Sequence, residues 1–121
     1  MDFSKDAEIL IFNFGFWKIR YSDDYIFSNP GFSPECAAFL KKKCPSLRIL
    51  IMDNISLNPW KNKPLGREAH RAFLLENDIL IVEDADLSSL NKKTEVFEII
   101  IAPLRFKSAD GTPVTIMGRT S

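Results

Sequence analysis

Histidine is almost absent from this sequence: the 121 residues include one, His70. A zinc site built from imidazole ligands needs several histidines, so this chain cannot assemble one alone. The sequence also has no glycine-rich phosphate loop and no CxxC, HExxH or GxSxG motif. No motif of these kinds therefore identifies a function.

Net charge is missing as well, because 16 basic side chains balance 16 acidic ones. Broad nucleic-acid binding requires a basic surface that displaces counterions, so we expect no nucleic-acid partner. A neutral chain with ten phenylalanines has little charge repulsion between copies. The composition therefore favours self-association.

Long apolar runs are absent, and cysteine is scarce. No window approaches the roughly 20 apolar residues of a membrane-spanning helix, and the first ten residues have no signal-peptide pattern. We therefore expect a cytoplasmic protein with no membrane partner. The two thiols, Cys36 and Cys44, are then expected to be reduced and to serve packing.

Short apolar runs alternate with two helical patterns. The first helix is predicted to begin at Ser33-Pro34-Glu35 and to end before Pro45, and the second to cover 67–76. The predicted strands are residues 7–14, 47–52, 79–82, 96–102 and 114–117. This order predicts a single α/β domain, residues 1–121, with a mostly buried mixed sheet and two main helices.

Two further features of the pattern bear on the fold and on function. The run Ile99-Ile100-Ile101 does not alternate with polar residues, which predicts a strand with both faces covered. The long segment 54–66, rich in proline and asparagine, is predicted to be a loop. Long loops in compact domains are often functional.

His70 is the first candidate functional residue. On a helix it shares one face with Phe73 and Leu74, so its imidazole is predicted to point toward the apolar side. This pattern is typical of a hydrogen-bonded core histidine. It also fits a metal ligand or a proton carrier near neutral pH.

Acidic side chains follow two predicted strands. Glu83 follows the run 79–82 and Asp53 follows the run 47–52, where sites tend to form in open α/β sheets. The two acids and His70 are therefore predicted to converge there, with Asp53 in a substrate pocket. A buried carboxylate there needs a cation or a donor, although either acid could instead be solvated. Asp84 and Asp86 are expected to be solvated or capping, and Trp60 to line a substrate pocket or to cover the core.

Several segments, in order, resemble the cyclase family of metal-dependent hydrolases, which includes bacterial kynurenine formamidase. A Gly-Trp turn and a "PGLSPE" helix start resemble FGFW at 14–17 and NPGFSPE at 29–35. The family's "VGIDxxS" strand is similar to ILIMDNIS at 49–56, and its "AHRxLL" helix to GREAHRAFL at 66–74. The "IxIVEx" strand and the closing "LPL…GSPVR" segment resemble ILIVED at 79–84, APLRF at 102–106 and GTPV at 111–114. The order and approximate spacing hold over residues 8–119, and the ordered set is more specific than any one piece.

The resemblance implies a swivelling β/β/α fold and hydrolysis of amides or cyclic substrates, with N-formylkynurenine the best-known substrate. It implies zinc or manganese as cofactor. His70 matches the helix histidine of the family's metal site, and Glu83 matches the strand-end glutamate that binds metal. The segment between them is one residue longer than in the commonest members.

The departure from the family is larger than the match. The family's H-x-G-T-H-x-D-x-P-x-H segment, which supplies most metal ligands and the general base, has no counterpart here. The chain is therefore expected to correspond to the carboxy-terminal half, as a truncated or split version. A catalytic zinc needs about three protein ligands, and His70 and Glu83 supply two.

Two hypotheses follow from this departure. The chain is half of an enzyme whose missing ligands come from a separate polypeptide or from a domain-swapped copy. Alternatively, it is a non-catalytic remnant, stable as a homo-oligomer, with a binding or structural role. Exposed apolar surface and an unpaired sheet edge are expected in either case.

Overall fold

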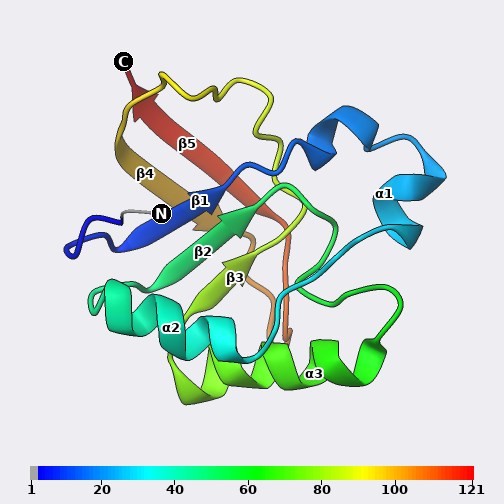
Figure 1. Cartoon of the computed structure of the whole chain (residues 1–121). Helices are drawn as coiled ribbons and strands as arrows, with labels where there is room; N and C mark the ends of the chain where they lie inside the picture. The colour runs from blue at the N-terminus through cyan, green and yellow to red at the C-terminus, as the bar shows by residue number, and fades with distance from the viewer. Residues whose placement is uncertain (1–2) are drawn as a thin grey trace. The chain divides into compact units, whose positions relative to one another are not determined.

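The strands lie in two separate sheets in the computed structural model, which describes residues 3–121 of the chain (Figure 1). The chain divides into two compact units, Met1–Ser89 and Leu90–Ser121. The α/β class predicted from the sequence is confirmed. The predicted single mixed sheet is wrong, because the parallel and the antiparallel strands do not pair with one another.

The first unit contains a three-stranded parallel sheet with the strand order β1-β2-β3. The strands are β1 (Ile9–Phe12), β2 (Ile49–Met52) and β3 (Leu80–Val82). Leu50 in the central strand pairs with Leu10 on one side and Ile81 on the other. Because the strand order follows the chain order, two crossovers of the usual right hand place their helices on the same face of the sheet.

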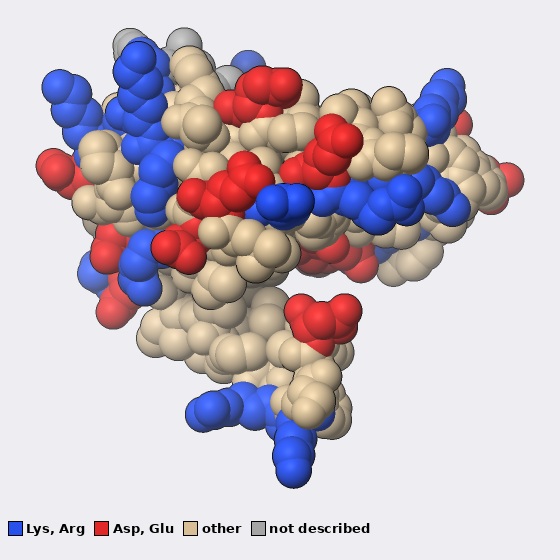
Figure 2. Space-filling model, turned by 90° about the horizontal axis from the view of Figure 1, so that it is seen from below, with Lys and Arg blue, Asp and Glu red and all other residues tan. Residues whose placement is uncertain are grey.

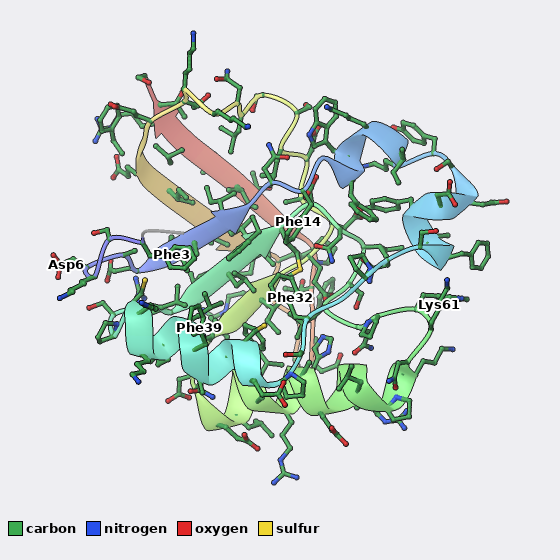
Figure 3. The ribbon with its side chains drawn as sticks, viewed as in Figure 1. Phe3, Asp6, Phe14, Phe32, Phe39 and Lys61 are labelled. Carbon is green, nitrogen blue, oxygen red and sulfur yellow. The ribbon has the colours of Figure 1, made fainter. Side chains whose placement is uncertain are left out.

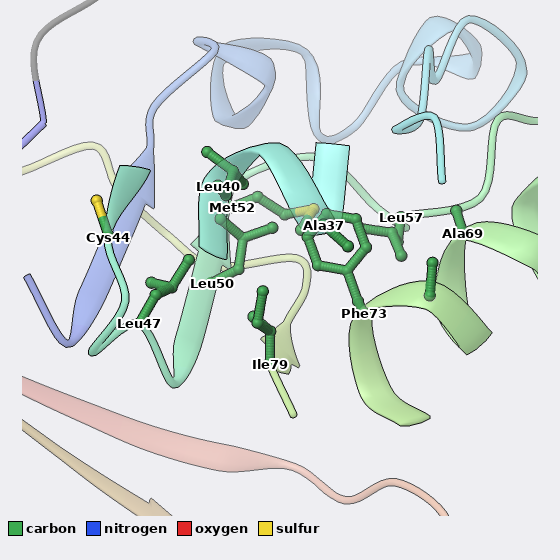
Figure 4. Packing of buried hydrophobic residues seen from close by; sticks show 11 residues of the cluster. Ala37, Leu40, Cys44, Leu47, Leu50, Met52, Leu57, Ala69, Phe73 and Ile79 are labelled. Atoms are coloured by element: carbon green, nitrogen blue, oxygen red, sulfur yellow. The ribbon is translucent and has the colours of Figure 1, made fainter. Parts of the chain in front are cut away.

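Two longer helical segments cover that face. They are α2 (Glu35–Lys43) and α3 (Lys63–Arg71), which continues as the wider turn η2 (Ala72–Glu76). Leu50 and Met52 on β2 pack with Leu40 of α2 and Phe73 of η2 in one fully buried cluster (Figure 4). Cys44, also in this cluster, is a free thiol, which confirms its predicted packing role.

The helix starts differ from the sequence prediction. Ser33 was predicted to cap α2, but the helix begins at Glu35 without a side-chain cap. The second helix begins four residues before the predicted Arg67, because the Asn62 side chain accepts a hydrogen bond from the Leu65 amide and Pro64 suits the first turn. The predicted loop 54–66 is correspondingly shorter.

The connection from β1 to α2 carries two short helical turns and an aromatic cluster. The turns are η1 (Phe16–Ile19) and α1 (Asp23–Phe27). Phe14 at the end of β1 lies beside Phe32 at the entry to α2, with ring centroids 5.9 Å apart (Figure 3). These rings hold the connecting segment near the sheet.

The second unit is an antiparallel hairpin of β4 (Val96–Pro103) and β5 (Val114–Thr120). Ile100 pairs with Met117, and each exposes about half of its side chain. The prediction that both faces of the run Ile99–Ile101 are covered is therefore wrong for Ile100.

Candidate functional site

His70 and Glu83 come together at the carboxyl end of the parallel sheet. His70 lies in the last turn of α3, and Glu83 directly follows β3. The imidazole Nε2 lies 3.2 Å from the carboxylate Oε1, and each side chain is 31% exposed. The structure thus joins the two residues that the sequence analysis singled out and leaves them accessible to solvent.

The hydrogen bonds of His70 fix which nitrogen carries its proton. Nδ1 lies 3.1 Å from the Gly66 carbonyl oxygen and 3.0 Å from the Asn58 amide oxygen. A carbonyl oxygen only accepts hydrogen bonds, so Nδ1 must be the donor. In the neutral imidazole, Nε2 then presents a lone pair to Glu83.

Glu83 Oε1 is itself held by two donors from the loop that follows β2. The Leu57 amide donates to it at 2.6 Å, and the Ser56 hydroxyl donates at 3.1 Å. A carboxylate oxygen can accept both bonds, and the one from Leu57 is as short as charge-assisted hydrogen bonds are. Two acceptor atoms, Nε2 and Oε1, therefore face one another, as they do around a shared proton or cation.

A buried asparagine network supports this loop. Asn29 is 4% exposed, and its amide nitrogen donates to the carbonyl oxygens of Ser56 and Asn58. Asn54 is fully buried and donates to the Asn29 amide oxygen at 3.0 Å. The sequence analysis did not single out Asn29, Ser56 or Asn58. The only signal was the asparagine-rich composition of the loop.

An open cleft of about 380 Å³ adjoins the pair. Ser56 and Asn58 line the cleft, and the same two side chains bond to Glu83 and His70. Its apolar lining is formed by Ile26, Ile55, Pro59 and Trp60. Only the Ser56 and Asn58 side chains would then separate a ligand in this cleft from the His70–Glu83 pair.

Trp60 lines the cleft, as one of the two predictions for it stated. Its ring meets Phe27 edge to face with centroids 5.0 Å apart, and the Lys63 ammonium lies 5.2 Å from its centroid. The exposed Trp60 ring therefore forms part of the wall of the cleft.

Asp53 was predicted to converge with His70 and Glu83, but it does not line the cleft. It is fully buried, and its carboxylate accepts hydrogen bonds from the amides of Phe14, at 2.8 Å, and Trp17, at 3.2 Å. These bonds fasten the segment after β1 to the end of β2. Among the observed contacts, the role of Asp53 is structural.

Asp84 belongs to a second structural cluster. The Tyr25 hydroxyl donates to the Asp84 carboxylate and to the Asp53 carbonyl oxygen, and Arg20 forms an ion pair with Asp84 at 3.1 Å. Burial, reinforced by the adjacent Asp84 carboxylate, raises the pKa of the Tyr25 phenol well above its ordinary value. The phenol therefore stays protonated and fixes α1 to the strand ends. Asp86 caps the Ser88 amide, as predicted for a capping residue.

Comparison with models of protein families, with curated proteins and with solved structures finds no match to this chain. Among residues 3–121, no group of three or more His, Cys, Asp or Glu side chains is arranged to hold a metal ion. No helix in the described part of the chain is long and apolar enough to cross a membrane.

Proposed function

We propose that the chain contributes His70 and Glu83 to a divalent-metal site of a cyclase-family amide hydrolase. One observation carries the proposal: two acceptor atoms, Nε2 and Oε1, face one another at 3.2 Å. The ordered segments that resemble the family support it, since they assign metal binding to these same two positions. The family assignment and the swivelling β/β/α fold are part of this proposal.

The spacing of the pair fits two positions in a zinc coordination shell. Zinc lies about 2.0–2.2 Å from nitrogen and oxygen ligands, so adjacent corners of its tetrahedron are roughly 3.4 Å apart. The observed 3.2 Å is close to that edge. The Gly66 and Asn58 oxygens also supply the second hydrogen bond that metal-binding histidines usually make through their other ring nitrogen.

The two ligands do not complete a catalytic site. About three protein ligands are usual for catalytic zinc, and the described residues offer no third. The proposal therefore requires further ligands from a separate polypeptide or from a second copy of this chain. Manganese, which accepts the same donor types, is the alternative ion.

The chain's own residues orient the pair and shape its surroundings. A bound divalent ion would supply an activated water for hydrolysis of an amide carbonyl. The Gly66 carbonyl accepts a hydrogen bond from His70 Nδ1, which leaves the lone pair of Nε2 for a metal ion. The Leu57 amide holds the Glu83 carboxylate in place. The neighbouring cleft would receive the substrate, with Trp60 as part of its wall.

A second candidate function is a non-catalytic binding or structural role in a homo-oligomer, the alternative expected from the sequence. The lack of a third ligand among residues 3–121 favours it. In that case the contact between His70 and Glu83 ties α3 to the end of β3.

Calorimetric titration of the purified chain with zinc chloride and manganese chloride tests the metal site. We expect binding by the parent protein, and more than about tenfold weaker binding after His70→Ala or Glu83→Gln, because each removes one of two protein ligands. Glu68→Gln is the matched control, since Glu68 is an exposed carboxylate on the same helix.

Two outcomes of this titration, and one of a hydrolysis assay, distinguish the two candidate functions. Equal affinity in the parent, His70→Ala and Glu83→Gln proteins would refute the assignment of these ligands. No binding by the parent would mean that this chain does not hold the ion by itself, and would leave a separate polypeptide as the only source of the further ligands that the proposal requires. Amide hydrolysis that appears only when a second polypeptide restores metal binding would support the enzyme.

A further inference from the structure

The cleft beside His70 carries an excess of positive charge that the metal site does not use. Lys63 and Arg67 both line it, four residues apart on α3 and therefore on the same side of the helix. No Asp or Glu lines the cleft. Neither cation forms an ion pair with any residue in the part of the chain described, although five ion pairs occur elsewhere in it.

The side of the molecule drawn in Figure 2 shows no broad basic surface. Over the side of the molecule seen in Figure 2, acidic and basic side chains are interspersed. The chain as a whole is neutral. An anion would therefore be attracted by the two cations of the cleft rather than by a broad basic surface.

The remaining lining suits a flat apolar body. Trp60 is held in position by Phe27 on its edge, and Ile26, Ile55 and Pro59 complete the apolar wall. A volume of about 380 Å³ lies at the lower end of the range for small-molecule sites, which is about 300–1,000 Å³. A ligand of one ring and one charged group fits this size.

Buried hydrogen bonds and a close backbone contact hold the floor of the cleft, which favours a preformed site. Asn29 is buried, and both carbonyl oxygens that it holds belong to lining residues, Ser56 and Asn58. Gly31, with a φ of 68°, allows its backbone to approach Pro59 so closely that a Cβ atom would lie 2.3 Å from the Pro59 nitrogen. Little ordering cost then opposes ligand binding.

We infer that this cleft binds a small organic anion, with a carboxylate or phosphate monoester head on Lys63 and Arg67 and a flat apolar body against Trp60. The inference goes beyond the proposed function, because binding needs neither a metal ion nor the His70–Glu83 pair. An arginine and a lysine together accept either head group, so the experiment compares both.

The test uses the full metal-free chain, with benzoate and phenyl phosphate as probes and benzamide as an uncharged probe of the same shape. Binding is followed by two-dimensional ¹H–¹⁵N NMR at the Trp60 indole, identified by its loss in Trp60→Phe. We expect saturable shifts with at least one anion, and about tenfold weaker binding of benzamide, which lacks the charged hydrogen bonds. The stronger anion identifies the preferred head group.

Two charge-removing variants and one matched control complete the test. Lys63→Gln and Arg67→Gln should each weaken anion binding roughly three- to tenfold, since both side chains are exposed and partly screened. Lys61→Gln should leave binding unchanged, because Lys61 lies on the loop before α3 and does not line the cleft (Figure 3). The probes are added to the metal-free chain, which separates this result from the outcome of the metal titration.

The inference is overturned if neither anion gives a saturable shift, or if benzamide binds as tightly as benzoate and phenyl phosphate. It is equally overturned if both charge-removing variants bind the anions as the parent does.

Discussion

Gly66 lies inside α3 at the point where this helix meets the loop that carries Asn58. A Cβ atom added at Gly66 would lie 2.0 Å from the Asn58 amide oxygen and 2.8 Å from the Asn58 Cα. The first contact involves a side chain, but the second involves backbone, so the loop or the helix would have to shift. The same Asn58 oxygen accepts the hydrogen bond from His70 Nδ1.

Two opposing effects decide the stability of a Gly66→Ala protein. Alanine is favoured over glycine inside a helix by about 1 kcal/mol. Overpacking a close contact costs about 1–3 kcal/mol, and here it also strains a buttressed loop. We expect the clash to win, with a net loss of about 1 kcal/mol and a Tm lower by roughly 4 °C.

Urea and thermal unfolding followed by circular dichroism measure this effect. Gly111→Ala is the matched control, because a Cβ atom at Gly111 would meet nothing within 4 Å and this glycine has no left-handed backbone conformation. The control protein should be as stable as the parent or more stable. If Gly66→Ala were more stable than the parent, the gain in helix propensity would exceed the cost of the clash. The close contact between α3 and Asn58 would then not be needed to position His70.

Two further predictions concern the core and the Tyr25 phenol. Phe73→Ala should lower the free energy of unfolding in urea by about 3–5 kcal/mol, because Phe73 is fully buried in the main cluster. Leu75→Ala is the control and should cost little, because Leu75 is 77% exposed. Similar losses in the two variants would contradict the assigned core. Because the pKa of Tyr25 is raised in the folded protein, the unfolded chain releases the phenolic proton at lower pH. The contribution of Tyr25 to the free energy of unfolding should therefore be fully present below about pH 10 and should decrease as the pH rises further. Tyr25→Phe should remove this part of the alkaline decline, and an unchanged pH profile would show that the phenol is not held by Asp84.

The sequence predicted the elements of the fold better than their assembly. Short β-branched runs indicated every strand, because burial selects such residues locally. The division into two sheets depends on which strands pair, and no local pattern carries that information. The predicted start of the second helix was late because the cap is Asn62, five residues before the predicted start at Arg67.

The candidate site divides in the same way. The sequence by itself singled out one histidine, His70, and the strand-end acids Glu83 and Asp53 as candidates for chemistry, since residue type alone limits metal ligands and proton carriers. Tertiary structure alone decided that His70 and Glu83 meet at 3.2 Å while Asp53 turns to backbone amides. It alone brought Asn29 to the cleft formed by Asn58, Lys63 and Arg67, because Asn29 is distant from them in the chain and their meeting depends on how the loops pack.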